Sequence, residues 1–240
     1  MSEALYLALL YATLAAVTIP LGGFLARIEH FQNQWLENEL KHSVVAYGAG
    51  VLLAAVALVL VPEGQKALST LWIVIAVLSG GLMFMAADII LSRRGGSTAQ
   101  LLAMLLDFTP EAMALGASLA LGSESGLLLA LLMALQNLPE GFNAYREMIA
   151  IRPHQCRKIL IFFILLVPIG PVSAWIGFVW LSEMEMLLGF IMLWATGGIL
   201  YLTFQDIAPQ VRLDKDWWPP MAAVAGFLTG LVGQHLLVHT

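Results

Sequence analysis

Two short segments place ionisable and amide side chains inside apolar stretches of the chain. The first is Asp107-Phe-Thr-Pro110-Glu111 and the second is Gln136-Asn-Leu-Pro139-Glu140. Each spaces two oxygen-bearing side chains four residues apart, on one face of a helix, and each has a Pro directly before its Glu. Charge inside an apolar span is costly and indicates a functional site. The two segments therefore predict the two halves of one cation site.

The candidate ligands of this site are Asp107, Glu111, Gln136 and Glu140. Three carboxylates and one amide oxygen are hard ligands that suit a divalent cation, and no thiolate accompanies them. Without a cation the carboxylates would repel one another, so we expect metal binding to release protons. A proton relay or a Na⁺ site could use the same carboxylates, and both stay open as alternatives.

The composition indicates an integral membrane protein. The chain is 60% hydrophobic and 11% charged, whereas a soluble domain has about 25% charged residues. Its apolar runs are each close to the ~20 residues that a spanning helix needs. We predict an all-α polytopic protein with one transmembrane domain over residues 1–240 and eight spanning helices. The predicted spans cover residues 4–26, 43–62, 67–87, 99–122, 126–147, 159–182, 186–208 and 217–238.

The basic residues predict the orientation, because Lys and Arg in short loops are retained on the cytoplasmic side. If the N-terminus lies outside, Lys66 is the only basic residue on the outer side. The remaining ten are on the cytoplasmic side: Arg27, Lys41, Arg93, Arg94, Arg146, Arg152, Arg157, Lys158, Arg212 and Lys215. We therefore expect both termini outside a cell (inner) membrane, with the first span as an uncleaved anchor.

The sequence lacks the motifs that are typical of several function classes. Cys156 is the single cysteine, so there is neither a disulfide framework nor a thiolate cluster. No Gly-rich phosphate loop and no basic nucleic-acid patch appear, and no protease motif supports an intramembrane hydrolase built on Asp107 and Glu140. We expect no enzyme activity, no cofactor, no nucleotide and no nucleic acid. The expected partners are a divalent metal ion and the lipid bilayer, and a homodimer stays open.

The two segments belong to one helical hairpin, because Gly122-Ser-Glu-Ser-Gly126 reads as a tight polar turn. Equal spacing on both sides of the turn brings Glu111 to the level of Gln136 and Asp107 to the level of Glu140. At 1.5 Å per residue the group lies about 15–25 Å below the turn, near the middle of a ~30 Å hydrocarbon core. Pro110 and Pro139 should kink the two helices beside it.

The span 126–147 is polar toward the cytoplasm and apolar toward the outside. From Gln136 and Glu140 its face continues inward to Asn143 and Glu147 and outward through leucines and Met133. The pattern indicates a wet cytoplasmic exit and a dry outer barrier, although an outer half turned toward lipid would give the same pattern. The candidate pathway residues are Asn137, Asn143, Glu147, Asp88, Gln205 and Asp206.

Five motifs together resemble the ZIP family of divalent-metal transporters. They are Tyr47-Gly-Ala-Gly50, Pro62-Glu63-Gly64, Pro110-Glu111, Gln136-Asn-Leu-Pro139-Glu140-Gly141 and Asp206-Ile-Ala-Pro209. The resemblance implies a bundle whose fourth and fifth helices carry the metal site, surrounded by the first three and last three helices as inverted repeats. It also implies transport of zinc, iron, manganese, cobalt or cadmium toward the cytoplasm.

The chain departs from the ZIP pattern at three positions. Asp107 stands where the family's zinc transporters usually have His, Phe108 where Asn is usual, and Gly170 where many bacterial members have Glu. Of the family's two adjacent metal positions, only the one built from Asp107, Glu111, Gln136 and Glu140 is complete. The resemblance thus implies a mononuclear, carboxylate-rich site. A ZIP-like membrane protein that senses or binds metal without transport is the alternative.

Overall fold

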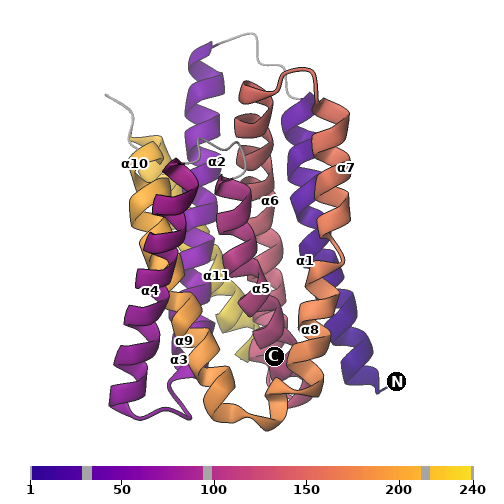
Figure 1. Ribbon diagram of the computed structural model, residues 1–240, viewed down its shortest axis with the longest axis vertical. Helices are drawn as coiled ribbons and strands as arrows, with labels where there is room; N and C mark the ends of the chain where they lie inside the picture. Colours follow the sequence, from indigo (N-terminus) through magenta and orange to yellow (C-terminus); the bar gives the residue numbers. More distant parts are fainter. Residues whose placement is uncertain (1, 29–33, 94–98, 212–216, 239–240) are drawn as a thin grey trace.

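The computed structural model describes residues 2–28, 34–93, 99–211 and 217–238, and its regular elements are all helical. The chain forms a bundle of long, nearly upright helices (Figure 1). The α-helices are α1 (Glu3–Ile28), α2 (Gln34–Ala55), α3 (Val61–Gly64), α4 (Thr70–Arg93), α5 (Ala99–Ala120), α6 (Ser125–Ile151), α7 (Cys156–Leu166), α8 (Ile169–Val179), α9 (Glu185–Leu202), α10 (Ala208–Val211) and α11 (Trp218–Val238). Two π-helical segments, η1 (Val56–Leu60) and η3 (Thr203–Ile207), and a short 3₁₀ helix, η2 (Leu181–Glu183), complete them.

Six helical stretches in the described residues are long and apolar enough to cross a membrane. They are Glu3–Ile28, Glu39–Gly64, Thr70–Ile90, Cys156–Glu183, Glu185–Ile207 and Trp218–Leu237. The other two long helices, α5 and α6, have 22 and 27 residues but carry polar side chains that lower their hydropathy. The chain is therefore an all-helical protein of the multi-pass membrane type, and the count of eight spans stays a prediction.

Two predicted spans differ from the helices in detail. The helix predicted over 43–62 begins earlier, at Gln34, and reaches Gly64 through η1 and α3. The span predicted over 159–182 is interrupted at Val167 and Pro168, between α7 and α8. Pro168 has no backbone N–H and cannot continue the helical ladder. Hydropathy alone did not reveal this break, because the residues on both sides of it are equally apolar.

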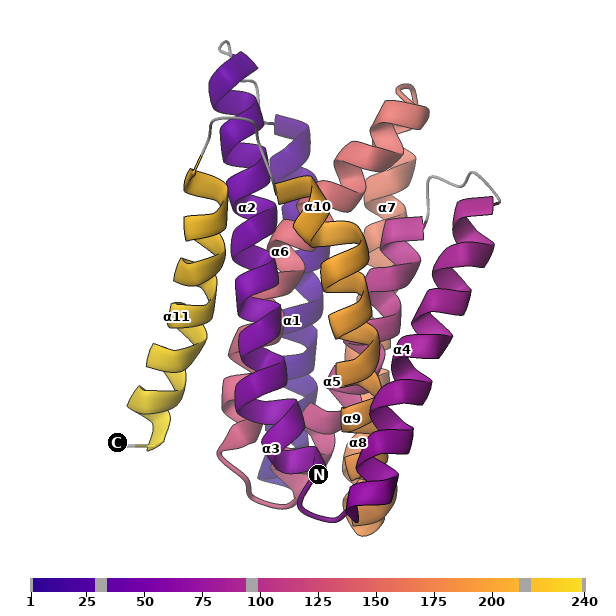
Figure 2. The same ribbon diagram turned by 90° about the vertical axis from the view of Figure 1, so that its left-hand side faces the viewer.

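The successive long segments run in alternating directions, which brings both chain ends to the same end of the bundle (Figure 2). We call this end the terminal face. It also contains α3 and the turn between α5 and α6, whereas α10 and the connection from α6 to α7 lie at the opposite face. Both termini were expected outside the membrane, and the side that the terminal face occupies stays a prediction.

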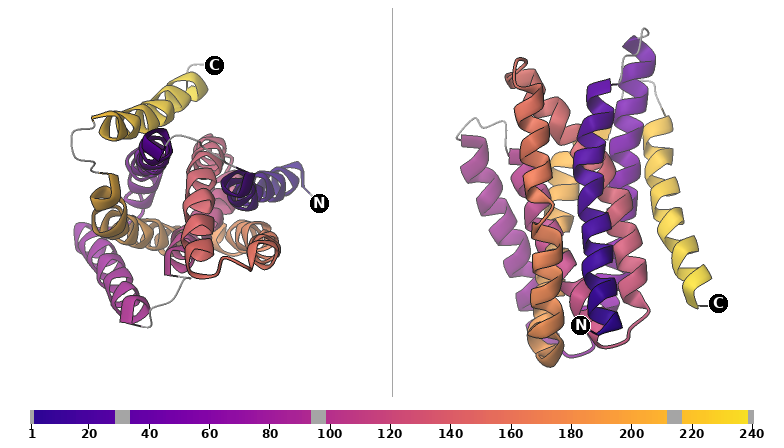
Figure 3. Two further views of the ribbon diagram at one scale, coloured as in Figure 1. Left: turned by 90° about the horizontal axis from the view of Figure 1, so that it is seen from above. Right: turned by 90° about the vertical axis from the view of Figure 1, so that its right-hand side faces the viewer.

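Helices α5 and α6 lie inside the bundle rather than on its rim (Figure 3). Helix α6 packs against α1, α2 and α5, and α5 packs also against α8 and α9. Their inward residues join the main apolar core, which includes Phe108, Leu115, Leu129 and Leu132. The polar segments predicted from the sequence therefore lie in the part of the protein most remote from its surroundings.

Within the described residues, four pairs of the longer helices pack closely at reciprocal glycines: α1 with α6, α5 with α8, α2 with α11, and α4 with α9. In each pair one glycine on each helix faces a backbone carbonyl of the other helix, with which a Cβ would collide. These glycines are Gly22 and Gly141, Gly116 and Gly177, Gly50 and Gly226, and Gly80 and Gly197. Small residues allow helices in membranes to approach in this way.

The α2 and α9 segments repeat one local pattern at a separation of 147 residues. The matching features are Gly50 and Gly197 at the close contacts, the π-helical segments Val56–Leu60 and Thr203–Ile207, and Pro62 and Pro209. The two segments run in opposite directions, so η1 lies toward the terminal face and η3 toward the opposite face (Figure 2). Their relationship supports the expected inverted repeat around α5 and α6.

Candidate metal centre

The turn between α5 and α6 fixes the register of the two central helices. Gly122 adopts φ 69°, a left-handed conformation that glycine accepts without steric cost. Its N–H donates to the Leu119 carbonyl at 3.2 Å, and the Ser123 N–H donates to the Ser118 carbonyl at 2.9 Å. Helix α5 thus ends at Ala120, and α6 begins at Ser125, as the predicted polar turn requires.

Glu111 and Gln136 meet across the α5–α6 interface. The Gln136 Nε2 atom donates a hydrogen bond of 2.7 Å to Glu111 Oε2. The two side chains are 0% and 1% exposed, so this polar pair lies entirely within the protein. The hydrogen bond confirms the register that was predicted by counting from the turn.

Asp107 and Glu140 belong to the same region. Asp107 is 3% exposed, and its Oδ1 atom accepts a hydrogen bond of 2.8 Å from the Phe108 N–H. The Asp107 carboxylate lies close enough to Glu140 and to Glu111 for their charges to interact. The structure therefore joins Glu111 to Gln136 across α5 and α6, with buried Asp107 and the Glu140 carboxylate in the same region.

Several buried oxygen atoms in this region have no hydrogen-bond partner in the described part of the chain. They are Glu111 Oε1, Gln136 Oε1, Asn137 Oδ1 and Glu140 Oε2. All four are acceptors, and a buried acceptor without a donor is costly. A cation or a water molecule would satisfy them.

The described residues do not gather three His, Cys, Asp or Glu side chains in an arrangement that could hold a metal ion. The charges of Asp107, Glu111 and Glu140 influence one another, but the three carboxylates do not surround one point. Repulsion among three carboxylates favours separation when nothing positive lies between them. Coordination of one ion by all three would require them to draw together.

The neighbouring position of the predicted site is filled by apolar packing. Phe108 is 1% exposed, and a Cβ on Gly170 would lie 3.0 Å from the tip of its ring. The Asn137 amide is directed to another helix, because its Nδ2 donates to the Ala15 carbonyl at 3.0 Å. Phe108 and Gly170, two of the three residues that depart from the ZIP pattern, therefore pack against each other and offer no ligand.

Pro110 and Pro139 lie inside α5 and α6, which continue through them. Because proline has no N–H, the carbonyls of Leu106 and Leu135 lack the usual helical donor four residues later. Next to Pro139, a small pocket is lined by Val45, Gly48, Ala49, Pro139, Glu140, Asn143 and Ile207. Its volume of about 20 Å³ has room for one water molecule. Glu140 thus faces a gap between α2, α6 and η3.

The pathway candidates nearer the opposite face differ in their surroundings. Asn143 lines the pocket beside Glu140, whereas the Gln205 side chain is exposed in η3. Asp88 accepts a hydrogen bond of 3.0 Å from the Tyr201 hydroxyl, and Asp206 lies close enough to Asp88 and Glu147 for their charges to interact. Sequence reasoning missed Tyr201 and Ile207, which have no chemical motif and are identified by their contacts alone.

Between the central site and the terminal face, the face of α6 that continues from Gln136 is apolar and buried. Leu129, Leu132 and Met133 are each 0% exposed, whereas Leu127 and Leu131, on another face of the same half, are exposed. The interpretation that the face with Leu129, Leu132 and Met133 is turned toward lipid is therefore wrong. A dry barrier between the central oxygens and the terminal face is the remaining explanation of the pattern.

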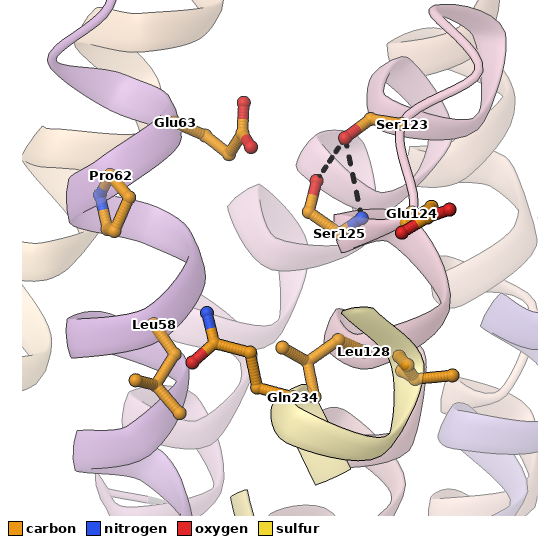
Figure 4. A pocket seen from close by; sticks show the side chains of 9 residues that line it. Leu58, Pro62, Glu63, Ser123, Glu124, Ser125, Leu128 and Gln234 are labelled. Atoms are coloured by element: carbon orange, nitrogen blue, oxygen red, sulfur yellow. Dashed lines mark hydrogen bonds between the residues drawn. The ribbon is translucent and has the colours of Figure 1, made fainter. Parts of the chain in front are cut away.

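A larger cavity opens at the terminal face, beyond this barrier (Figure 4). Its volume is about 350 Å³. It is lined by Leu58, Pro62, Glu63, Ser123, Glu124, Ser125, Leu128, Gln234 and Leu237. We call it the terminal-face cavity. Its residues come from η1, α3, the α5–α6 turn, the start of α6 and α11, which include segments far apart in the sequence.

No protein-family model matches the chain, and no curated protein matches it. The resemblance to the ZIP family therefore rests on the sequence motifs described above, and the function on the chemistry of the central site.

Proposed function

We propose that the protein is a transporter that moves a divalent transition-metal cation across the membrane toward the cytoplasm. The cation would bind one carboxylate-rich site formed by Asp107, Glu111, Gln136 and Glu140. The observation that carries the proposal is the buried Glu111–Gln136 hydrogen bond, surrounded by oxygen atoms without donors. Burial of such a polar group between two membrane helices costs free energy, and a group kept at that cost indicates a function.

A divalent cation accounts for the charge of the site better than a proton or Na⁺ does. Three carboxylates provide up to three negative charges, and one divalent ion neutralises two of them. Gln136 Oε1 would provide a neutral oxygen, which is a common ligand of hard cations. Glu111 Oε2 accepts a hydrogen bond from Gln136 Nε2. If a cation replaced this hydrogen bond, Glu111 Oε2 could also become a ligand.

Transport rather than storage is supported by the surroundings of the site. The pocket beside Glu140 and the buried Asn143 lie on its inner side, whereas buried Leu132 and Met133 close its outer side. A site with polar groups on one side and an apolar barrier on the other fits one state of an alternating-access carrier. The inverted relationship of the α2 and α9 segments agrees with such a mechanism.

Metal uptake into liposomes tests the proposal and distinguishes it from metal sensing. The full chain would be reconstituted, and uptake of Mn²⁺ would be measured with Zn²⁺, Fe²⁺, Co²⁺ and Cd²⁺ as competitors. We expect saturable uptake that requires Glu111 and Glu140. Metal binding without uptake would favour the sensor alternative. The absence of both binding and uptake would refute the metal site itself.

A further inference from the structure

We infer that Asn137 is a positioning residue, which holds the turn of α6 that bears Gln136 and Glu140 against α1. Asn137 lies between these two candidate ligands in the sequence, but its amide is directed to another helix. Its role rests on the proposed function of the central site, because Asn137 acts through Gln136 and Glu140 rather than on the metal ion. Three features of α1 and α6 point to this role: a buried side-chain hydrogen bond, two glycine contacts beside it, and a proline in each helix.

The Asn137 amide can face α1 in one orientation only. Its Nδ2 donates to the Ala15 carbonyl at 3.0 Å, and a carbonyl oxygen only accepts, so the NH₂ group must be turned toward it. Asn137 is 1% exposed, and its Oδ1 has no hydrogen-bond partner in the described part of the chain. A buried acceptor without a donor costs free energy. An asparagine kept at that cost indicates that its N–H donor is needed.

The hydrogen bond lies beside close backbone contacts between α1 and α6, which run in the same direction (Figure 2). One helical turn further along both helices, a Cβ on Gly141 would collide with the Ile19 carbonyl. A Cβ on Gly22 would likewise collide with the Leu138 carbonyl. The glycines permit this approach, but they have no side chain that could fix the rotation of α6 about its axis. The Asn137 amide supplies that restraint.

Each of the two helices lacks an internal hydrogen bond near this level. Pro139 has no N–H for the Leu135 carbonyl, and Pro20, inside α1, has none for the Ala16 carbonyl. The turn of α6 from Leu135 to Pro139 is therefore held less firmly by its own helix and more by its neighbours. Asn137 lies in the middle of this turn, and its bond to α1 replaces the missing restraint.

The directions of the two candidate ligands follow from this restraint. Successive residues of an α-helix are turned by about 100°, so Gln136 faces α5 when Asn137 faces α1. Gln136 there donates to Glu111, and Glu140 lies one turn further on the same face of the helix. A rotation of α6 would move the oxygens of Gln136 and Glu140 together. Asn137 should therefore control metal affinity without contacting the metal.

Amide hydrogen exchange in the metal-free full chain tests the restraint itself. We would replace Asn137 by Ala, Leu or Asp and follow, by mass spectrometry, the peptides that cover residues 134–142. Loss of one typical hydrogen bond should raise exchange there roughly fivefold. Thr18→Val is the matched control, because the Thr18 hydroxyl donates to the same Ala15 carbonyl at 2.7 Å but lies on α1 itself. It should leave exchange in α6 unchanged.

Mn²⁺ titration of the same variants separates positioning from a purely structural role. Asn137→Ala and Asn137→Leu should weaken the affinity about tenfold or more, as loss of a ligand's supporting partner does, whereas Thr18→Val should keep the parent's affinity. Asn137→Asp distinguishes positioning from ligation. A ligand should bind Mn²⁺ at least as tightly when it becomes a carboxylate. A positioning residue that has lost its N–H, with an oxygen against the Ala15 carbonyl, should give weaker binding.

Each other outcome contradicts the role of Asn137 in a different way. Exchange at the parent's rate in both Asn137→Ala and Asn137→Leu would show that the bond restrains nothing, whatever happens to Asn137→Asp, including failure to fold. Faster exchange with the parent's affinity would make the bond purely structural. Tighter Mn²⁺ binding by Asn137→Asp would make Asn137 a ligand. A parent chain that binds no Mn²⁺ would instead refute the proposed function, a result that is seen before any substitution is made.

Discussion

Pro139 lies directly against Gly48: a Cβ at residue 48 would be 2.7 Å from Pro139 Cγ. The contact joins α2 to the proline turn of α6, one residue before Glu140. Gly48 and Pro139 also line the small pocket that contains Glu140. The position of this candidate ligand therefore depends on the absence of a side chain on another helix.

Gly48→Ala should destabilise the protein and weaken metal binding. The proline ring is rigid, so the added methyl group must move α2 away from α6, and such overpacking costs about 1–3 kcal/mol. Thermal unfolding of the purified protein in detergent would measure the stability, and Mn²⁺ titration would measure the affinity.

Gly81→Ala is the matched control for this substitution. It is also within a helix, but a Cβ there would lie 3.4 Å from its nearest neighbour, the Gly197 carbonyl oxygen, which is an ordinary contact. Alanine in a helix interior is favoured over glycine by roughly 0.5–1 kcal/mol. We expect no loss of stability, and equal losses in both variants would show that Gly48 has no special role.

Glu111→Ala and Glu140→Ala should each abolish uptake while the protein stays folded. Each change removes a central carboxylate, and loss of a ligand should cost at least the 10–100-fold in affinity that loss of a ligand's supporting partner costs. Uptake into liposomes measures the effect, and Glu185→Ala, an exposed residue near the terminal face, serves as control. Full-rate uptake by either central variant would disprove its role as a ligand.

The central site should bind one metal ion. Phe108 fills the neighbouring position against Gly170, and the Asn137 amide donates to the Ala15 carbonyl, so ligands for a second ion are lacking there. Calorimetric titration should give one ion per chain, and anomalous scattering should give one central peak. Two ions about 4 Å apart, as in binuclear sites, would contradict this arrangement.

The hairpin register could be predicted because a tight turn sets it locally. Gly122 and its neighbours determine the turn, and the equal spacing of Glu111 and Gln136 from it then determines which side chains meet. Their hydrogen bond needed no knowledge of the other helices. For the same reason, the helical nature of the chain and its long apolar spans were predictable from composition and run length.

The remaining features depend on contacts between distant parts of the chain. The partner of Asn137 is Ala15, which lies 122 residues away, and nothing in the local sequence of either residue indicates it. The π-helical segments before Pro62 and Pro209 likewise have no clear local signal. Burial of Leu132 was also unpredictable, because an apolar leucine side chain packs equally well against lipid and in a protein core.

Asp107→His should raise the preference for Zn²⁺ over Mn²⁺. Carboxylate oxygen suits Mn²⁺ and similarly hard ions, whereas imidazole favours Zn²⁺. Asp107 is buried close to Glu111 and Glu140, so a ring at this position would face the same ion. The substitution also removes a negative charge, and affinity for both metals should fall while their ratio changes.

The ratio of Zn²⁺ to Mn²⁺ uptake in competition is therefore the quantity to measure. Asp107→Asn is the matched control, because it removes the same charge and keeps an oxygen ligand of similar size. It should lower uptake of both metals without the shift toward Zn²⁺. If Asp107→His leaves the ratio unchanged and Asp107→Ala transports normally, Asp107 is not a metal ligand. Its buried carboxylate would then act as a proton carrier or as part of a gate beside Glu140.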